Sequence, residues 1–360
     1  MNMTQNEDWT TELPHGVTLQ IFNGEELIFS SGGKWLMPIF ELEQFMETYT
    51  GAADDLRAHD TAIGKAAAVM MIRLGVKHIH ANIGSALAEQ YIQNLNDGLI
   101  QYVNRDEKLC ACSEKIEFVY DIKVPKLLCQ TEDQLEQMTD SDAMYRILRQ
   151  RANLVRGAAV DVEHLSCHYS SLHDFSFSLP AGGNLLIIGG NGAGKTTLLR
   201  FLSGNLLPEG GKILIGGKTL NELEPRTVCY VPQQQDSVMF PLSVEEVVGL
   251  GIPKSEKQHA KIIAAALKRM GCENLSGRSF STLSGGEKQK VSIARCIAQN
   301  AKVLLLDEPT SALDESSRQA VTQILKSLSV KEIPTIITVT HDMVFAKELG
   351  WQSLVIGDAA

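Results

Sequence analysis

The fold is decided by Gly189-Gly190-Asn191-Gly192-Ala193-Gly194-Lys195-Thr196, which fits the pattern G-x-x-x-x-G-K-[ST]. The apolar run Leu185 to Ile188 precedes this loop, and a helix is expected from Thr197 to Leu202. In such a strand–loop–helix context, the glycines let backbone N–H groups turn inward around phosphate oxygens. Lys195 is expected to reach the β- and γ-phosphates of a nucleotide, and the Thr196 hydroxyl to bind Mg²⁺.

A matching pair of acids follows a second apolar run. Lys302 to Leu306 is typical of a buried strand, and Asp307-Glu308 comes directly after it. A carboxylate at the end of such a strand can hold the magnesium ion through water, and the next can polarise an attacking water. We therefore expect Asp307 to serve the metal and Glu308 to be the catalytic base.

Five further segments occur in a fixed order with these two, over roughly residues 158–358. They are the aromatic Tyr169, Val231-Pro232-Gln233, Leu283-Ser284-Gly285-Gly286-Glu287-Lys288-Gln289, Ser311-Ala312-Leu313-Asp314 and Thr340-His341-Asp342. Together the set resembles the motifs of ATP-binding cassette (ABC) ATPases and covers a little over half of the chain. Glu287 is a departure, since the family often has Gln at that position.

The resemblance implies a role for each motif residue. Tyr169 would stack on adenine, although an exposed aromatic ring can equally serve packing. Gln233 would help to place Mg²⁺ and water, and His341 would contact the γ-phosphate. Asp314 would couple two sites across a dimer interface. ATP would be held by Gly189, Gly190, Asn191, Gly192, Ala193, Gly194, Lys195, Thr196 and Thr197 and, from the second subunit, by Ser284, Gly285, Gly286 and Glu287.

The resemblance also implies the architecture and the partners. The fold would be an α/β P-loop cassette with a RecA-like core, an antiparallel β subdomain and a helical signature subdomain at roughly Gln234–Gln299. Each motif occurs once, so the second cassette of the dimer would be another copy of this chain or a homologue. Because every motif is intact, we expect a homodimer, with ATP and Mg²⁺ as cofactors. The 112 residues from Lys195 to Asp307 leave no room for a long coiled coil and fit a transporter subunit that docks onto a separate permease.

The expected docking stretch is Gln234 to Leu250. Within and beyond it, Phe240-Pro241-Leu242-Ser243-Val244 to Gly251 resembles a segment of importers for metal ions and metal chelates. The alternative is a soluble ABC-type ATPase switch that works without a permease and has the first part of the chain as a ligand or metal sensor.

Composition divides the chain near Arg151 to Gly157. Residues 1–150 hold 12 basic and 23 acidic side chains, a net charge of −11, and the remaining residues carry +1. We expect residues 1–155 to form a separate α/β domain and residues 156–360 to form the cassette. In the first domain, Asn23-Gly24 predicts a hairpin, Leu36 to Tyr49 a helix, and Asp60 or Thr61 the N-cap of a helix over Ala62 to Leu74.

Short motifs in this first domain resemble a small uncharacterised bacterial family with a cytidine-deaminase-like three-layer α/β/α fold. They are Asp60 to Ala68, Asn104-Arg105-Asp106 and Cys110 to Glu114. Zinc deaminases need a His- or Cys-x-Glu and a Pro-Cys-x-x-Cys, and neither occurs, so a regulatory role is expected instead.

Two alternatives stay open in this domain. His78, His80, Cys110 and Cys112 are either packing residues or a zinc site. Asp60 and Lys65 form either a small-molecule pocket or a cap beside a surface lysine.

Composition excludes several classes of protein. The 360 residues are 44% hydrophobic with a net charge of −10, which argues against disorder and against a broad basic face for nucleic acid. No run of about 18 apolar residues occurs, and Met1 to Glu12 is polar, unlike a signal peptide. The seven scattered cysteines fit reduced thiols in the cytoplasm. We expect a cytoplasmic protein that is peripheral on the inner face of the cell membrane, through its permease.

Overall fold

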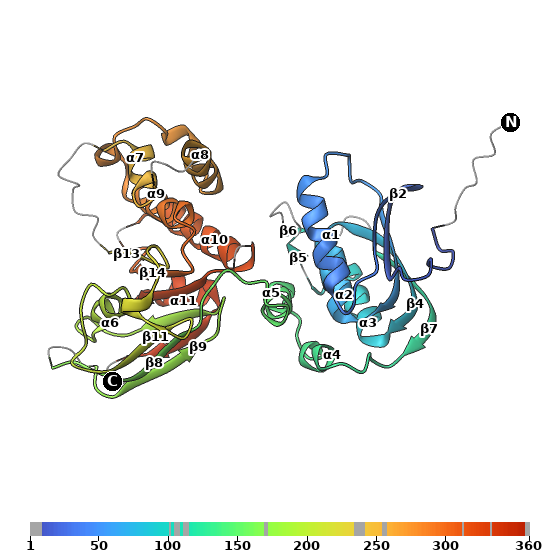
Figure 1. The fold of residues 1–360 in the computed structure, drawn as a ribbon, viewed down its shortest axis with the longest axis horizontal. Coiled ribbons are helices and arrows are strands. Elements are labelled where there is room, and N and C mark those ends of the chain that lie inside the picture. Colours follow the sequence, from blue (N-terminus) through green and yellow to red (C-terminus); the bar gives the residue numbers. More distant parts are fainter. Residues whose placement is uncertain are drawn as a thin grey trace. The chain divides into compact units, whose positions relative to one another are not determined.

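The computed structural model describes residues 9–100, 102–103, 109–110, 115–168, 172–233, 242–253, 258–311, 313–331 and 333–356 (Figure 1). The chain divides into two compact units, Met1–Leu154 and Val155–Ala360. None of the helices within the described ranges is long and apolar enough to cross a membrane.

The first unit begins with the predicted hairpin, which is confirmed. Strand β1 (Leu19–Asn23) pairs antiparallel with β2 (Glu26–Ser31), and Asn23 lies opposite Glu26. The turn is therefore made by Gly24 and Glu25. Gly24 has a φ of 62°, a left-handed conformation that glycine adopts without steric cost.

The sheet of the first unit has the order β2-β1-β3-β4-β7. Its strands β3 (Leu56–Ile63), β4 (Val76–Ser85) and β7 (Glu117–Val124) are parallel, and α2 (Lys65–Arg73) and α3 (Ala86–Asn96) connect them. Strand β1 runs antiparallel to β3. A separate two-stranded ladder joins β5 (Tyr102–Val103) to β6 (Leu109–Cys110).

The helices of this unit form one layer. Helix α2 contacts α3, α1 (Met37–Thr48), α4 (Gln130–Leu135) and α5 (Ser141–Arg151), and it also packs on β3 and β4. The other face of the sheet carries polar side chains in register, with Arg57 opposite His78 and His59 opposite His80. The described residues therefore form two layers in this unit, where the resemblance predicts three.

The start of α2 differs from the prediction. The helix begins at Lys65 and its N-cap is Gly64, whereas Asp60 and Thr61 lie within β3. The strand continues past Asp60 because Ala62 and Ile63 still pair with Ile83 and Gly84 of β4. The prediction of a cap at Asp60 or Thr61 is therefore wrong.

The core of the second unit is a parallel sheet of order β13-β14-β15-β10-β16. The strands are β10 (Asn184–Ile188), β13 (Val228–Val231), β14 (Val303–Asp307), β15 (Thr335–Thr340) and β16 (Gln352–Val355). The side chains of β10, β14 and β15 are almost all buried, as expected for central strands of a parallel sheet covered on both faces, whereas the edge strand β16 is largely exposed. The helices that join this core are α6 (Lys195–Leu202), α10 (Glu315–Lys331) and α11 (Met343–Leu349).

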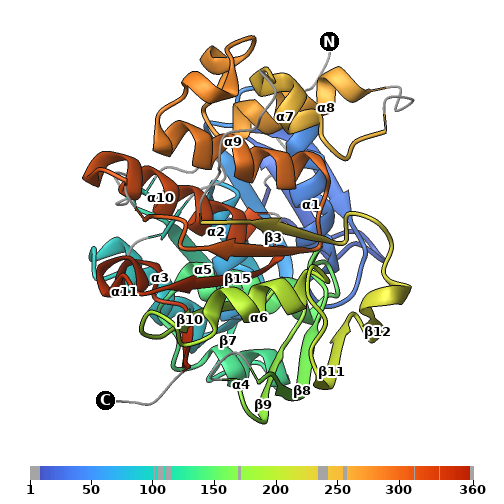
Figure 2. The ribbon, with the colours of Figure 1, turned by 90° about the vertical axis from the view of Figure 1, so that its left-hand side faces the viewer.

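Two further parts flank this core. An antiparallel sheet has the order β12-β11-β8-β9, with β8 (Val160–Ser166), β9 (Phe175–Leu179), β11 (Gly210–Ile215) and β12 (Lys218–Thr219). The helices α7 (Val244–Gly249), α8 (His259–Arg269) and α9 (Gly285–Ala298) pack together. Figure 2 shows these helices and the antiparallel strands on opposite sides of the core. The three parts are those that the resemblance predicts.

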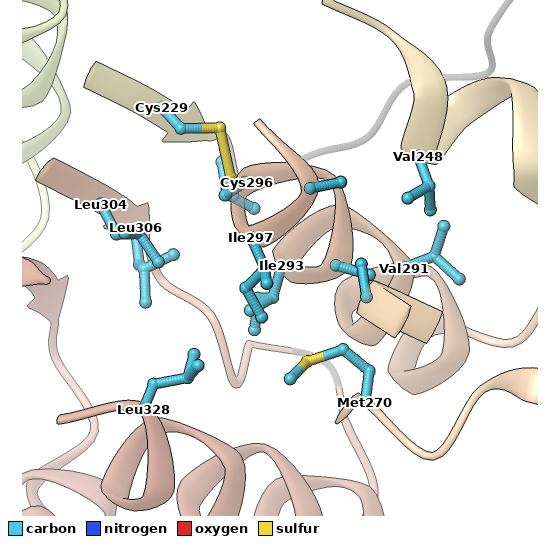
Figure 3. Close-up of a cluster of buried hydrophobic side chains, with 14 of the residues drawn as sticks. Cys229, Val248, Met270, Val291, Ile293, Cys296, Ile297, Leu304, Leu306 and Leu328 are labelled. Carbon is cyan, nitrogen blue, oxygen red and sulfur yellow. A yellow bond between two sulfur atoms is a disulfide. The ribbon is translucent and has the colours of Figure 1, made fainter. Parts of the chain in front are cut away.

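One finding about the cysteines corrects the expectation of reduced thiols. Cys229 of β13 and Cys296 of α9 form a disulfide, with their Cα atoms 5.6 Å apart (Figure 3). Both side chains lie among buried residues such as Leu304 and Ile293. The two cysteines are 67 positions apart in the sequence, so only the packing of α9 against β13 brings them together.

Candidate functional site

The glycine-rich loop lies between β10 and α6. Gly192 and Gly194 have φ angles of 83° and 89°, and Gly194 is the N-cap of α6. These left-handed conformations strain any other residue, so the two glycines determine the path of the loop. The loop borders a cavity of about 360 Å³ lined by Asn191, Gly192, Ala193, Gly194, Lys195, Thr196, Thr197, Gln233 and Glu308.

Lys195 is buried and is held by its own loop. Its Nζ donates to the carbonyl oxygens of Gly189 (2.8 Å) and Gly190 (2.9 Å). The same nitrogen lies 3.7 Å from Glu308 Oε1, and both side chains are only 7% exposed. The Lys195 ammonium group therefore lies beside the cavity and within ion-pair distance of Glu308, which lines the same cavity.

Asp307 joins the loop to the core sheet. Thr196 Oγ1 donates to Asp307 Oδ1 at 3.1 Å, and the Tyr230 hydroxyl donates to Asp307 Oδ2 at 2.9 Å. Burial raises the pKa of Asp307 above its ordinary value, and the neighbouring Glu308 carboxylate acts in the same direction. Tyr230 was missed in the sequence, where a tyrosine inside an apolar strand carries no motif.

Glu308 contacts the end of the next strand. Its Oε2 accepts from Thr340 Oγ1 and from the His341 amide N–H, both at 3.3 Å, and its Oε1 lies 2.8 Å from His341 Nδ1. Glu308 also has a left-handed φ of 48°. A non-glycine residue in this region is strained, and such strain is concentrated at functional sites. Sequence reasoning named Glu308 and His341 but not the contact from Thr340.

A second cavity, of about 540 Å³, opens at this acid. Its lining residues are Glu308, Thr310, Ser311, His341, Asp342 and Met343. Glu308 thus lines both this cavity and the one at the loop. A water molecule in either cavity could reach the same carboxylate.

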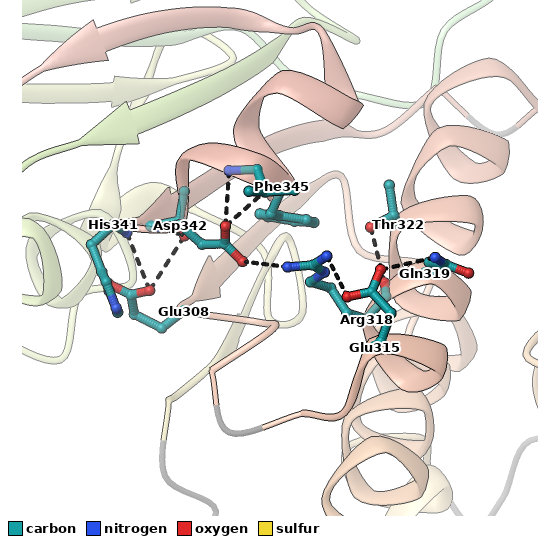
Figure 4. A network of polar contacts seen from close by, with 10 residues as sticks. Glu308, Glu315, Arg318, Gln319, Thr322, His341, Asp342 and Phe345 are labelled. Atoms are coloured by element: carbon teal, nitrogen blue, oxygen red, sulfur yellow. Dashed lines mark hydrogen bonds and ion pairs between the residues drawn. The ribbon is translucent and has the colours of Figure 1, made fainter.

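An arginine extends this cluster to α10, as Figure 4 shows. Arg318 Nη1 lies 3.7 Å from Asp342 Oδ2, and Arg318 Nη2 lies 2.5 Å from Glu315 Oε2. Asp342 in turn accepts from the amides of Val344 and Phe345 and caps α11. Arg318 was also missed, because the pairing joins two helices and leaves no local signal.

The signature segment begins α9. Ser284 is its N-cap, and Glu287 Oε2 accepts from the Ser284 amide at 2.8 Å while Ser284 Oγ accepts from the Glu287 amide at 3.3 Å. The Ser284 amide also lowers the pKa of Glu287. This reciprocal capping box explains locally why an acid can stand where the family often has Gln.

Gly285 and Gly286 are the first residues of this helix. A Cβ on Gly286 would lie 2.6 Å from Ser317 Oγ of α10. The two helices therefore approach so closely at Gly286 that a larger residue there would force Ser317 to shift.

The remaining motif residues lie in different surroundings. The carboxylate of Asp314 accepts from the Ser317 amide (2.7 Å) and Ser316 Oγ (2.8 Å) at the start of α10, and the first of these bonds lowers its pKa. Asp314 is thus a helix cap in the isolated chain. Tyr169 and the first eight residues of the expected docking stretch, 234–241, lie outside the described residues.

The histidines of the first unit have acidic partners. His78 Nδ1 lies 3.0 Å from Glu117 Oε2, and His80 Nε2 lies 3.2 Å from Asp121 Oδ1. Within the part of the chain that the structure describes, no cluster of three or more His, Cys, Asp or Glu side chains could hold a metal. The side chain of Cys110 and the whole of Cys112 lie outside that part, so the predicted zinc site stays a prediction.

Comparison with known proteins agrees with the geometry of the second unit. The family model for ABC transporters matches residues 172–311. The chain is 42% identical to the hemin import ATP-binding protein HmuV of Enterobacter cloacae over 178 residues, which cover 47% of this chain and 68% of that protein. It is 37% identical to the thiamine import ATP-binding protein ThiQ of Aliivibrio fischeri over 51% of this chain and 80% of that protein.

A solved structure has a similar fold. The protein cbiO1 from Clostridium perfringens, part of the ABC transporter complex cbiONQ, matches with a TM-score of 0.50 and 31% identity over 55% of this chain and 84% of that one. The predicted cassette fold is confirmed. The chain belongs to the ABC transporter family, and it is an ATP-binding and ATP-hydrolysing subunit of such a transporter.

Proposed function

We propose that this chain hydrolyses ATP to power uptake of a metal ion or metal chelate through a separate membrane permease. The observation that carries the ATP hydrolysis in this proposal is the position of Glu308, which lies between Lys195 of the loop and His341 and lines both cavities. Two of the chain's relatives are a hemin and a thiamine import ATP-binding protein, which supports an importer. The resemblance of the segment from Phe240 to Gly251 favours a metal or metal-chelate cargo.

Magnesium fits the residues beside the loop. Thr196 and Asp307 present oxygen atoms within one hydrogen bond of each other, and Gln233 lines the same cavity. Hard cations of this kind prefer carboxylate, hydroxyl and amide oxygens. These three residues would hold Mg²⁺, which when bound would neutralise charge on the phosphate oxygens.

The remaining side chains have separable tasks. Lys195 would exchange its two carbonyl acceptors for phosphate oxygens, which are stronger acceptors because they are charged. Glu308 would accept a proton from the attacking water. His341 would orient this carboxylate through Nδ1, which lies 2.8 Å from Glu308 Oε1, and would contact the γ-phosphate. Gln233 would sense that phosphate from the cavity wall.

Two copies of the chain would complete the reaction. The amides of Gly285 and Gly286 lie at the N-terminus of a 14-residue helix, where N–H groups and the helix dipole favour an anion. We propose that these amides, with Ser284 and Glu287, bind the nucleotide on the loop of the partner copy. Asp314 would couple the two sites, and Tyr169 would stack on adenine.

The first unit would regulate this ATPase. We assign residues 1–155 to a cytidine-deaminase-like α/β domain without deaminase chemistry, and residues 156–360 to the cassette. The chain would lie on the cytoplasmic face of the membrane and be held there by its permease.

A dimerisation assay tests the site roles. In the Glu308→Gln variant, we expect MgATP to convert the monomer to a stable dimer in gel filtration with light scattering, because ATP is bound but not consumed. The Glu224→Gln variant, an exposed acid away from the site, is the matched control and should behave as the wild type. A Glu308→Gln protein that stays monomeric with bound MgATP would contradict the proposed shared sites.

A membrane assay tests the permease. Affinity purification of the full chain from detergent-solubilised membranes is expected to recover an integral membrane subunit. Recovery of soluble partners alone would favour the soluble switch that is the alternative function.

A further inference from the structure

The first unit contains a cavity that the ATPase does not use. Its volume is about 350 Å³, and it lies where β3 ends and α2 begins. Most of its wall is apolar and includes Trp35, Leu36, Pro38, Ala62 and Leu127. A cavity of this size and lining is typical of a small-molecule site.

One buried acid lines this cavity without a cationic partner. Asp60 is 8% exposed, and its Oδ1 accepts from Thr61 Oγ1 (3.3 Å) and from the Ala62 amide (3.1 Å). Among the described residues, no basic side chain contacts it. Buried carboxylates are normally paired, so Asp60 offers an acceptor that the fold itself leaves without a counter-charge.

The second acid of the cavity behaves differently. Glu132 accepts from the Lys65 amide (3.0 and 3.2 Å) and from Ser85 Oγ (2.7 Å), so it occupies the N-terminus of α2. A Cβ on Gly64 would lie 2.3 Å from Glu132 Oε2, so glycine is needed there for the acid to approach. Glu132 is therefore a structural anion, and it makes the helix start unsuitable for an anionic ligand.

The aromatic side chain of the wall is held in an unusual conformation. Trp35 has a left-handed φ of 56° and is 45% exposed. A bulky residue with positive φ is a genuine outlier, and such strain is concentrated at ligand sites. Its indole ring is available to a flat or cationic ligand.

We propose that this cavity binds a small organic cation with a flat aromatic body, of the amidinium or protonated amino-heteroaromatic class. The N–H groups of the ligand would donate to the Asp60 carboxylate, and its ring would lie against Trp35 and the apolar wall. Lys34 at the rim is exposed and can turn away into solvent. This site is independent of the proposed transport function.

Benzamidine is a suitable probe, with benzamide and benzoate as neutral and anionic molecules of nearly the same shape. We expect calorimetric titration of the full chain to detect benzamidine and to show at least tenfold weaker binding of the other two. Charge-assisted hydrogen bonds are the strong ones, so Asp60→Asn should weaken benzamidine binding at least tenfold. Asp97→Asn, an exposed acid at the end of α3, is the control and should bind as the wild type.

The pH dependence of binding adds a test that needs no variant. Burial raises the pKa of Asp60 to about 7, so benzamidine affinity should rise roughly tenfold from pH 6 to pH 8 as Asp60 ionises. The other ionisable side chains that line the cavity are Lys34, Cys129 and Glu132. Equal binding of benzamide, or benzamidine affinity unchanged by Asp60→Asn and by pH, would overturn the proposal.

Discussion

Replacement of Asp60 by asparagine should stabilise the first unit, and the gain should depend on pH. Asp60 is buried beside an apolar cavity, and it accepts hydrogen bonds from Thr61 and from the Ala62 amide. Burial disfavours its charged form and raises its pKa from 3.8 to about 7. Asparagine has a similar shape, can accept the same hydrogen bonds and never becomes charged.

The sign and size of the effect follow from this pKa. The pKa of Asp60 is higher in the folded chain than in the unfolded chain. The contribution of Asp60 to the free energy of unfolding is therefore fully present below pH 3.8 and is lost as pH rises to about 7. One pKa unit corresponds to about 1.36 kcal/mol, so the complete loss is about 4 kcal/mol. Between pH 5 and pH 8, the stability difference between Asp60→Asn and wild type should grow by about 2.5 kcal/mol.

Urea unfolding followed by tryptophan fluorescence can measure this difference. The chain has three tryptophans, and Trp9 and Trp35 lie in the first unit. A Trp351→Phe background therefore makes the signal report on the first unit alone. Asp97→Asn in the same background controls for the loss of one exposed negative charge. A stability gain of equal size at pH 5 and pH 8 would refute the buried, unpaired state of Asp60.

Three further substitutions test the cassette. Thr196→Val removes the hydroxyl beside Asp307 and should weaken MgATP binding about tenfold, measured by nucleotide titration. Ser284→Ala removes the N-cap of α9 and should lower the free energy of unfolding by about 1 kcal/mol in urea. Gly286→Ala places a Cβ 2.6 Å from Ser317 Oγ and 2.7 Å from Ser317 Cβ and should cost about 1–3 kcal/mol by the same measurement, and this cost should be smaller in a Ser317→Gly background, which removes both atoms.

Each substitution has a result that would contradict its premise. For Thr196→Val, the contradiction is an equal loss of affinity with EDTA present. A Ser284→Ala protein as stable as the wild type would show that the cap contributes nothing. If Gly286→Ala costs as much in the Ser317→Gly background as in the wild type, the close approach of α9 and α10 is not the cause of the loss.

Local patterns predicted the second unit well. The loop, β10 and the strand that ends at Asp307 depend on short runs of apolar residues and glycines, and each is where the sequence indicates it. The contact of Thr196 with Asp307 spans 111 positions, and it could be predicted because both residues belong to recognisable motifs. The roles of these residues in catalysis stay predictions.

Contacts without a motif could not be predicted. Tyr230, Arg318 and the disulfide partner of Cys229 depend on how strands and helices pack, and a lone residue in an apolar strand or a helix gives no sign of its neighbour. The start of α2 was placed too early for a related reason. Asp60 is a good cap by residue type, but pairing of Ala62 with β4 keeps this segment extended.

Steady-state ATP hydrolysis by the full chain tests the central claim most directly. With saturating MgATP, Glu308→Gln should lower kcat about 10²- to 10⁴-fold, because the substitution removes the general base and keeps the shape of the side chain. Glu224→Gln should hydrolyse ATP at the wild-type rate. A Glu308→Gln protein with undiminished kcat would contradict the assignment of Glu308 and the mechanism built on it.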